Sequence, residues 1–191
     1  MKDPIALFQT WLDQAIQSGL EEPTAMTLAT VNPDGRPDAR MVLLKGVDDR
    51  GFLFFTNLES PKARALAHDP RAALCFYWMP LTKQVRIRGR VEMISNHEAD
   101  AYFASRPRLS QISAWASEQS QPMRGYFELE TRVAAVALRF GRKKVPRPPF
   151  WSGFRVVPTE IEFWIQKPFR RHQRFLYTRE KGGWQKHWLF P

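Results

Sequence analysis

Positively charged side chains beside short apolar runs are the feature of this sequence best suited to chemistry, and that chemistry is the binding of anions. Arg40-Met41-Val42-Leu43-Leu44-Lys45 is an apolar run with a cation at each end. Side chains alternate between the faces of a strand, so Arg40 and Lys45 are predicted to point to opposite faces. A buried cation is costly without an anion. Each of the two therefore needs an anionic partner, unless both reach solvent at the strand ends.

Three further groups of cations are candidate anion sites. Ser60-Pro61-Lys62 joins a serine cap, a first-turn proline and a lysine at a predicted helix start, where free backbone N–H groups favour anions. Segment 105–110 combines arginine with hydroxyl groups near another helix start. Arg170, His172 and Arg174 would share one face if the chain is extended there. Separate sites of this kind fit two phosphorylated small molecules better than the contiguous, aromatic-rich stripe of a nucleic-acid surface.

The bulk composition also indicates anionic partners. The net charge is +10 at pH 7, which suits nucleic acid, acidic lipid or phosphorylated small molecules. The charge runs Arg142–Arg147 and Arg86/Arg88/Arg90 are predicted to be only solvated faces. A hydrophobic fraction of 43% over 191 residues supports a packed core and excludes a disordered chain.

Side chains that could catalyse a reaction by themselves are lacking. The sequence has no nucleophile elbow, Walker loop, Gly-rich dinucleotide motif or Cys/His spacing for zinc, and no metal is expected. Its one cysteine, Cys75, lies in an apolar run and is predicted to be a buried, inert thiol. An enzyme without such groups takes its chemistry from an organic cofactor. The N-terminus lacks the apolar core of a signal peptide, and no 18-residue apolar run occurs, so a cytoplasmic location is expected.

The elements that must position these side chains are mainly short strands joined by tight turns. Strands are predicted at 26–31, 40–45, 52–56, 71–77, 84–93, 154–157, 160–164, 174–179 and 184–189. Helices are predicted from Pro4 to Gly19, from Pro61 through Ala67, through Tyr102 and Phe103 after a capping box at 95–98, at 110–117 and at 122–140. The fold class is therefore mainly β with helices (α+β), an antiparallel barrel or sandwich in one domain.

Marks along nearly the whole chain resemble those of one family. They are Thr24-Ala25-Met26, Ala29-Thr30-Val31, Arg40 to Lys45, Phe55-Thr56-Asn57, Gln84-Val85, Tyr102-Phe103, Ser105-Arg106-Pro107-Arg108, Ser110-Gln111-Ile112, Ala114-Trp115, Gln119-Ser120, Phe150-Trp151, Gly153-Phe154-Arg155, Ile161-Glu162-Phe163-Trp164 and Arg174-Phe175-Leu176-Tyr177. Together they resemble the pyridoxine/pyridoxamine 5′-phosphate oxidase family. The resemblance implies a single FMN-binding split β-barrel domain over 1–191, antiparallel with flanking helices, and a homodimer with FMN at the subunit interface.

The resemblance also assigns site residues. FMN would be bound by Arg40, Met41, Val42, Leu43, Leu44, Lys45, Phe55, Thr56, Lys62, Gln84, Gln119, Ser120, Trp164 and Arg174. The substrate, a phosphorylated B6 vitamer, would be bound by Lys45, Tyr102, Arg106, Ser110, Arg170 and His172. Arg170 and His172 would be the catalytic pair beside the pyridine ring. The implied reaction passes a hydride from carbon 4′ to the flavin, and O2 then takes the electrons and forms H2O2. Arg40 would face the FMN phosphate and Lys45 the substrate.

The chain departs from the family pattern at several positions. Pro61 stands where the family usually has arginine, Leu109 and Gln173 replace aspartates, and Arg171 replaces a leucine. The N-terminal arm that helps to cover the substrate in the family is expected to be short or absent.

Two alternatives stay open. One is a related split-barrel flavin oxidase of the phenazine-pathway type, which the ending at 183–189 loosely resembles. The other is a non-catalytic protein that binds FMN, pyridoxal phosphate or nucleic acid, which the net charge suggests. The presence of the six substrate-site residues favours the B6-vitamer oxidase, for which no nucleic-acid or membrane partner is expected.

Overall fold

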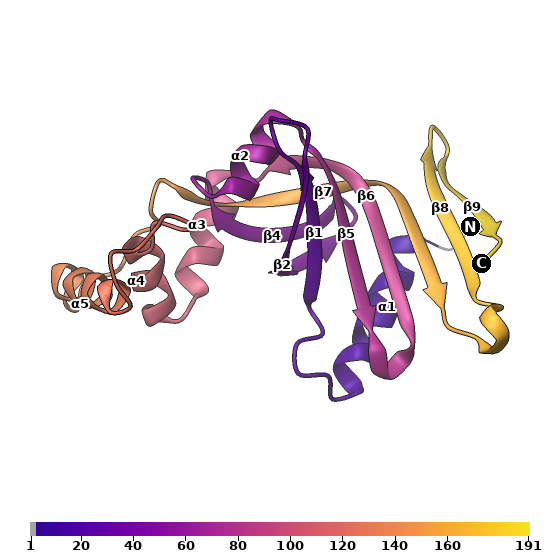
Figure 1. Ribbon diagram of the computed structural model, residues 1–191, viewed down its shortest axis with the longest axis horizontal. Coiled ribbons are helices and arrows are strands. Elements are labelled where there is room, and N and C mark those ends of the chain that lie inside the picture. Colours follow the sequence, from indigo (N-terminus) through magenta and orange to yellow (C-terminus); the bar gives the residue numbers. More distant parts are fainter. Residues whose placement is uncertain (1–2) are drawn as a thin grey trace. The chain divides into compact units, whose positions relative to one another are not determined.

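The structure is a computed structural model that describes residues 3–191; Met1 and Lys2, at the N-terminus discussed above, lie outside the described residues. The described chain forms two compact units. We call residues 3–54, 65–92 and 155–191 the sheet unit, and residues 55–64 and 93–154 the helical unit. Figure 1 labels their helices and strands.

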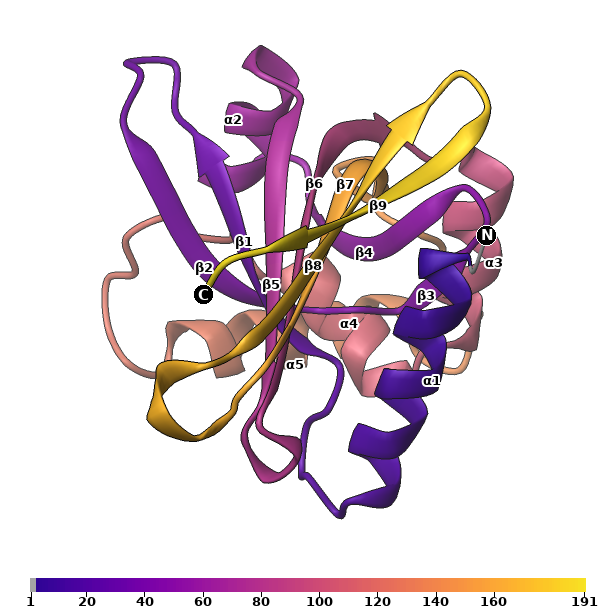
Figure 2. The ribbon, with the colours of Figure 1, turned by 90° about the vertical axis from the view of Figure 1, so that its right-hand side faces the viewer.

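Nine strands of the described residues form one sheet. They are β1 (Ala25–Val31), β2 (Pro37–Leu43), β3 (Gly46–Asp48), β4 (Gly51–Asn57), β5 (Arg71–Trp78), β6 (Lys83–Met93), β7 (Trp151–Ile165), β8 (Gln173–Glu180) and β9 (Gly183–Leu189). The order is β2-β1-β5-β6-β7-β4-β3, and β8 pairs with both β7 and β9. The β1–β2, β1–β5, β3–β4, β5–β6, β7–β8 and β8–β9 pairs are antiparallel. The predicted antiparallel α+β class is confirmed, and Figure 2 shows β5 beside β6 and the β8–β9 hairpin.

The first helix packs on the sheet through aromatic side chains. α1 spans Pro4–Gln17, and the Asp3 carboxylate caps it by accepting a hydrogen bond from the N–H of the second helical residue. The Phe8 ring lies 4.9 Å from that of Phe52, and the Trp11 ring lies 5.0 Å from that of Phe163. The helix predicted from Pro4 is confirmed.

The helical unit has a core of its own. The remaining helices are α2 (Pro61–His68), α3 (Asn96–Ser105), α4 (Arg108–Ala116) and α5 (Glu128–Phe140), and two short 3-10 turns are η1 (Met79–Leu81) and η2 (Pro168–Arg170). The predicted capping box at the start of α3 is present, because Ser95 and Glu98 each accept the other's backbone N–H. Phe103, Ile112 and Trp151 are buried together between α3, α4 and the start of β7.

The predicted strand at 40–45 is wrong in its bounds and its burial. β2 ends at Leu43, so the alternation of faces does not extend to Lys45. It is an edge strand of the sheet rather than a buried one, and Met41 is 61% exposed. Val42 and Leu43 are half-buried, and only Leu44, just beyond the strand, is fully buried. A sequence of apolar residues does not reveal whether a strand has neighbours on both sides.

Three other local predictions need correction. The strands predicted at 154–157 and 160–164 are one strand, β7, because Pro158 continues the extended backbone instead of ending it. α5 begins at Glu128 rather than at residue 122. The acidic residues of the first turn after Glu128 interact favourably with the helix dipole. Cys75 is half-buried rather than buried, and burial raises the pKa of its thiol.

No helix among residues 3–191 is long and apolar enough to cross a membrane. Within the same range, no group of three or more His, Cys, Asp or Glu side chains could hold a metal ion.

Gly89 marks a close approach between β6 and β7. A Cβ atom at this position would lie 2.1 Å from the carbonyl oxygen of Val157, which is backbone and cannot rotate away. We therefore expect Gly89→Ala to lower the free energy of unfolding by about 2 kcal/mol in a urea titration. Gly46→Ala is the matched control, because its nearest contact would be an ordinary 3.6 Å to Leu53. An equal loss in both variants would contradict the steric explanation.

Candidate active site

Arg106, in the helical unit, is a cation that rests on aromatic rings. It caps the end of α3, and its guanidinium carbon lies 4.9 Å from the centre of the Trp151 ring and 5.6 Å from that of Phe103. Its Nη1 atom is buried, and it has no hydrogen-bond partner among the described residues. Burial lowers the pKa of the Arg106 guanidinium, against the opposing influence of Tyr102. A half-buried cation with a buried, unused donor atom is suited to bind an anion.

Tyr102 lies one turn before Arg106 on α3 and belongs to an aromatic stack. Its ring is 3.9 Å from that of Phe55 and nearly parallel to it, and the Phe55 ring is in turn 5.1 Å from that of Trp151. Burial raises the pKa of the Tyr102 hydroxyl, so this group stays a neutral hydrogen-bond donor at physiological pH. Ser110, the third predicted phosphate ligand of this unit, is half-buried in the first turn of α4.

A second polar cluster gathers predicted FMN ligands that are far apart in sequence. Lys62 Nζ donates to Thr56 Oγ1 at 3.2 Å and to Gln119 Oε1 at 3.0 Å, and Thr56 Oγ1 donates to the same Gln119 atom at 3.3 Å. Ser120 follows with a left-handed backbone (φ 69°) and is exposed. Pro61, which replaces the usual arginine, is the first residue of α2 and keeps the helix start in place. The cluster therefore offers a lysine and neutral polar side chains near the start of α2, which suits a phosphate.

In the sheet unit, a buried carboxylate fixes two cations. Arg174 Nε donates to Glu162 Oε1 at 2.8 Å, and Arg174 Nη2 forms an ion pair with the same oxygen at 2.8 Å. Arg86 Nη1 donates to Glu162 Oε2 at 3.2 Å. Glu162 is only 8% exposed. Arg174 is a predicted FMN ligand, and it pairs across β7 and β8 with Trp164, another predicted ligand. Glu162 itself was not predicted to be a site residue, although an acid inside the apolar run 161–164 is a signal that could have identified it.

Gln84 is the third predicted FMN ligand of this sheet face. It precedes Arg86 by two residues on β6 and lies on the same side of the strand, opposite to the buried Val85. The predicted solvated row at 86–90 is therefore wrong for Arg86, which is half-buried and pairs with the buried Glu162. Arg88, which pairs with Glu160, and Arg90 are exposed.

The predicted catalytic pair does not lie on one extended strand. Arg170 is the last residue of η2. Phe169 (φ 56°) and Arg170 (φ 58°) both have left-handed backbone conformations, and β8 begins only at Gln173. The shared-face prediction for Arg170, His172 and Arg174 is therefore wrong, because Pro168 starts a turn there. Backbone strain of this kind is concentrated at functional sites.

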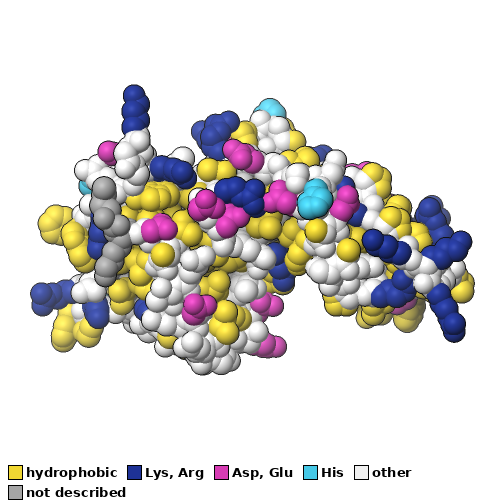
Figure 3. Space-filling model, turned by 180° about the vertical axis from the view of Figure 1, so that it is seen from behind, with side chains coloured by type: hydrophobic (Ala, Val, Ile, Leu, Met, Phe, Trp, Pro, Cys, Tyr) yellow, Lys and Arg dark blue, Asp and Glu magenta, His cyan; other side chains and the backbone are white. Residues whose placement is uncertain are grey.

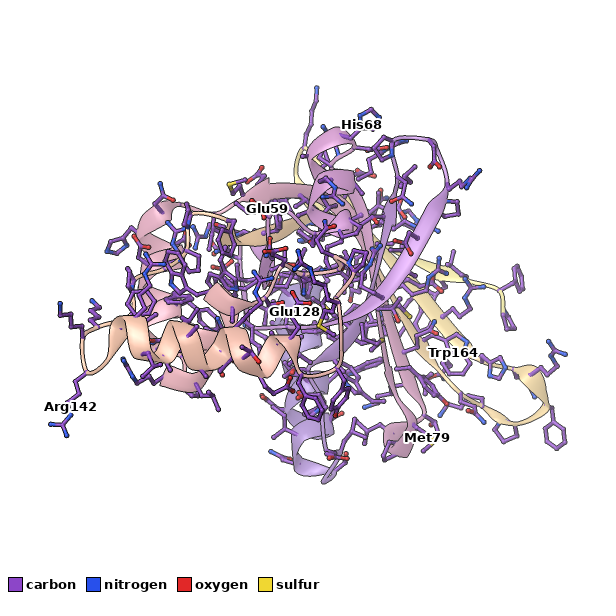
Figure 4. The ribbon with its side chains drawn as sticks, turned by 60° about the vertical axis from the view of Figure 1, so that its left-hand side comes forward. Glu59, His68, Met79, Glu128, Arg142 and Trp164 are labelled. Atoms are coloured by element: carbon purple, nitrogen blue, oxygen red, sulfur yellow. The ribbon has the colours of Figure 1, made fainter. Side chains whose placement is uncertain are left out.

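A hydrogen bond from the backbone selects the tautomer of the neutral His172 ring. The backbone N–H of Lys167 donates to His172 Nδ1 at 3.2 Å, which leaves the proton of the neutral ring on Nε2. The His172 ring lies 4.8 Å from the ring of Trp164, which Figure 4 labels near the end of β7. His172 is thus held as a hydrogen-bond donor at Nε2.

Arg40 already has partners inside the sheet unit. Its Nη1 atom donates to Thr30 Oγ1 at 2.8 Å and to the carbonyl oxygen of Leu28 at 3.1 Å, and it forms an ion pair with Asp38. Lys45 is exposed. The roles predicted for these two cations stay predictions.

The basic segment after α5 divides into two parts. Figure 3 shows lysine and arginine side chains gathered over the end of α5, where Arg142, Lys143 and Lys144 are exposed, and Figure 4 shows Arg142 pointing away from the helix. Arg147 is not solvated as predicted, because it donates to Asp100, to an asparagine on α3 and to the carbonyl oxygen of Trp151. It fastens this segment to the start of β7.

Comparison with known proteins shows the family of the chain. Residues 12–140 match the family described as pyridoxamine 5′-phosphate oxidase, and residues 151–191 match the pyridoxine 5′-phosphate oxidase C-terminal dimerisation region. The chain belongs to the pyridoxamine 5′-phosphate oxidase family. Its predicted membership is confirmed, and the second match indicates a homodimer. Membership also indicates that the chain binds a flavin.

Individual relatives are similar over almost their whole length. A pyridoxine/pyridoxamine 5′-phosphate oxidase of Azorhizobium caulinodans is 56% identical over 191 residues, covering 99% of this chain and 90% of the relative. One of Rhodospirillum rubrum is 55% identical over 195 residues, covering 100% and 97%.

Solved structures confirm the split-barrel fold. The crystal structure of PhzG from Burkholderia lata 383, in complex with tetrahydrophenazine-1-carboxylic acid, has a TM-score of 0.93 at 32% identity and covers 100% of this chain and 94% of that one. A pyridoxamine 5′-phosphate oxidase-related, FMN-binding protein of Nostoc punctiforme has a TM-score of 0.78 at 19% identity, covering 96% and 97%, and shows the fold alone.

Proposed function

We propose that the protein is an FMN-dependent oxidase that converts pyridoxamine 5′-phosphate or pyridoxine 5′-phosphate to pyridoxal 5′-phosphate, with O2 as the electron acceptor. The observation that carries the proposal is the buried, unpartnered Nη1 of Arg106, a phosphate site prepared in a chain 55–56% identical to oxidases of this name. The proposal includes a homodimer with FMN at the interface, a single FMN-binding split-barrel domain over residues 1–191, and a cytoplasmic location.

The side chains present suit two phosphorylated molecules. Lys62, Thr56 and Gln119 offer a cation and polar groups beside the start of α2 for the FMN phosphate. Arg174, held by Glu162, offers a fixed cation in the sheet unit. The predicted roles of Arg40 to Lys45, Phe55, Gln84, Ser120 and Trp164 toward FMN belong to the same proposal.

The chain's own contribution to the reaction is binding and orientation. Arg106, Tyr102, Ser110 and Lys45 would bind the substrate phosphate, and the remote phosphate would then anchor the pyridine ring. His172 would donate from Nε2 to a polar group of that ring, with Arg170 beside it. The redox chemistry, which is hydride removal from carbon 4′ and two-electron reduction of O2 to H2O2, is what FMN supplies when bound.

A second candidate is an oxidase acting on a phenazine precursor, which the similarity to PhzG favours. The identity to PhzG is 32%, against 55–56% to the B6-vitamer oxidases.

One assay tests the proposed function. Purified protein is loaded with FMN and given pyridoxamine 5′-phosphate in air, while the absorbance of pyridoxal 5′-phosphate and the release of H2O2 are followed. Equal formation of the two products is expected. Flavin reduction only by a phenazine precursor would favour the second candidate, and failure to bind FMN would exclude both oxidases and leave the non-catalytic alternative.

A further inference from the structure

A buried glutamine fixes the backbone around Arg106. Gln111, on α4, is 8% exposed. Its Nε2 atom lies within hydrogen-bond distance of three carbonyl oxygens, those of Phe103 (3.1 Å), Ala104 (3.2 Å) and Arg106 (3.0 Å). These groups end α3, where carbonyls have no partner within the helix. The turn that carries Arg106 is therefore tied to the next helix.

Trp151 fixes the side chain of Arg106. Its ring is 7% exposed and lies beneath the Arg106 guanidinium at 4.9 Å. The Trp151 ring packs edge-on against the Phe103 ring, with 5.1 Å between the ring centres. The backbone carbonyl oxygen of Trp151 accepts a 2.7 Å hydrogen bond from Arg147. Trp151 is thus a rigid surface on which the guanidinium rests.

The contact with the Trp151 ring leaves the N–H donors of Arg106 unoccupied. A carboxylate partner would compensate the buried charge but would occupy the N–H donors, as Glu162 does for Arg174. An aromatic face attracts the cation through its π electrons and occupies no donor. The unpartnered Nη1 of Arg106 is the direct result. The donors are therefore available to a phosphate without first breaking an ion pair.

We propose that Trp151 is a positioning residue of the substrate-phosphate site: its ring, with Gln111 holding the backbone, keeps the Arg106 guanidinium oriented and its buried Nη1 atom unpaired until the phosphate binds. The inference rests on the proposed function for the identity of the phosphorylated ligand. The preorganised phosphate site itself can be tested without turnover.

The test compares Trp151→Leu, which removes the aromatic face, with Trp151→Phe, which keeps a smaller one. The matched control is Trp115→Leu, because Trp115 belongs to the same unit and stacks with a different arginine, Arg139, at 5.3 Å. Each FMN-loaded full-length protein is assayed with pyridoxamine 5′-phosphate and, separately, titrated with inorganic phosphate by calorimetry. Thermal unfolding identifies any variant that is not folded at the assay temperature.

For Trp151→Leu we expect the KM and the phosphate Kd to rise together by about tenfold, with kcat changed less than about twofold. Trp151→Phe, which keeps a smaller and weaker aromatic face, should raise the phosphate Kd by about threefold, and Trp115→Leu should leave it unchanged. An unchanged phosphate Kd in folded Trp151→Leu overturns the inference; if that variant does not fold, an unchanged Kd in Trp151→Phe relative to wild type does so. Phosphate binding that depends on Trp151, in a protein that does not oxidise pyridoxamine 5′-phosphate, supports the inference and refutes the proposed function.

Discussion

Replacing Arg106 with alanine is expected to raise the KM for pyridoxamine 5′-phosphate by about 100-fold while changing the Kd of FMN by less than about twofold. Charge-assisted hydrogen bonds are worth about 1.5–3 kcal/mol each, and they are strongest in a site from which water is excluded. Arg106 meets both conditions at its Nη1 atom, a charged donor that is buried although the residue as a whole is half-buried, and that has no hydrogen-bond partner among the described residues. Steady-state kinetics and FMN fluorescence titration measure the two quantities.

The asymmetry between the two ligands is the informative part of this experiment. Arg106 rests on the Trp151 and Phe103 rings, whereas the cluster that we assign to FMN joins Lys62, Thr56 and Gln119 to one another by hydrogen bonds. Equal losses in substrate and FMN affinity would show that this division of the phosphate sites is wrong. Arg108→Ala is the matched control, since Arg108 lies two residues away and donates to the carbonyl oxygens of Lys143 and Gly141. It is expected to alter stability and leave the KM unchanged.

Local signals in the sequence were sufficient to predict where most helices begin. Asp3 before Pro4, Ser60 before Pro61, and the Ser95–Glu98 box each satisfy backbone N–H groups within a few residues, so their effect does not depend on the rest of the fold. The bounds of β2 and β7 were wrong for the opposite reason. Strand length and burial are set by neighbouring strands, which a short window of sequence does not contain.

The candidate site was predictable in composition but not in pairing. Motif resemblance selected Arg106, Lys62 and Arg174 as cations for phosphate, yet only the fold shows that their surroundings differ. An aromatic ring lies under Arg106, Lys62 donates to a hydroxyl and to an amide oxygen, and a carboxylate binds Arg174. Trp151 is distant in sequence from Arg106, and Glu162 pairs with arginines on two other strands. Contacts between separate segments of the chain leave no periodic signal in the sequence.

Glu162→Gln is expected to lower the free energy of unfolding by about 3 kcal/mol and to weaken FMN binding by about tenfold. The carboxylate is 8% exposed and compensates Arg174 and Arg86 together. Removing its charge leaves two partly buried cations facing each other, and such a change costs more than the pair itself contributes. Arg174 would also lose the two-point contact that fixes its direction. Urea unfolding and FMN titration measure the two effects.

Glu160→Gln separates burial from charge, because Glu160 lies two residues earlier on the same strand and forms the equivalent ion pair with Arg88. That pair is open to solvent, with 58% of the Arg88 side chain exposed. Its loss is expected to cost less than about 1 kcal/mol and to leave FMN affinity unchanged. If the two glutamine variants behaved alike, net charge on β7 would explain the result, and the assignment of Glu162 as the residue that holds Arg174 for the cofactor would fail.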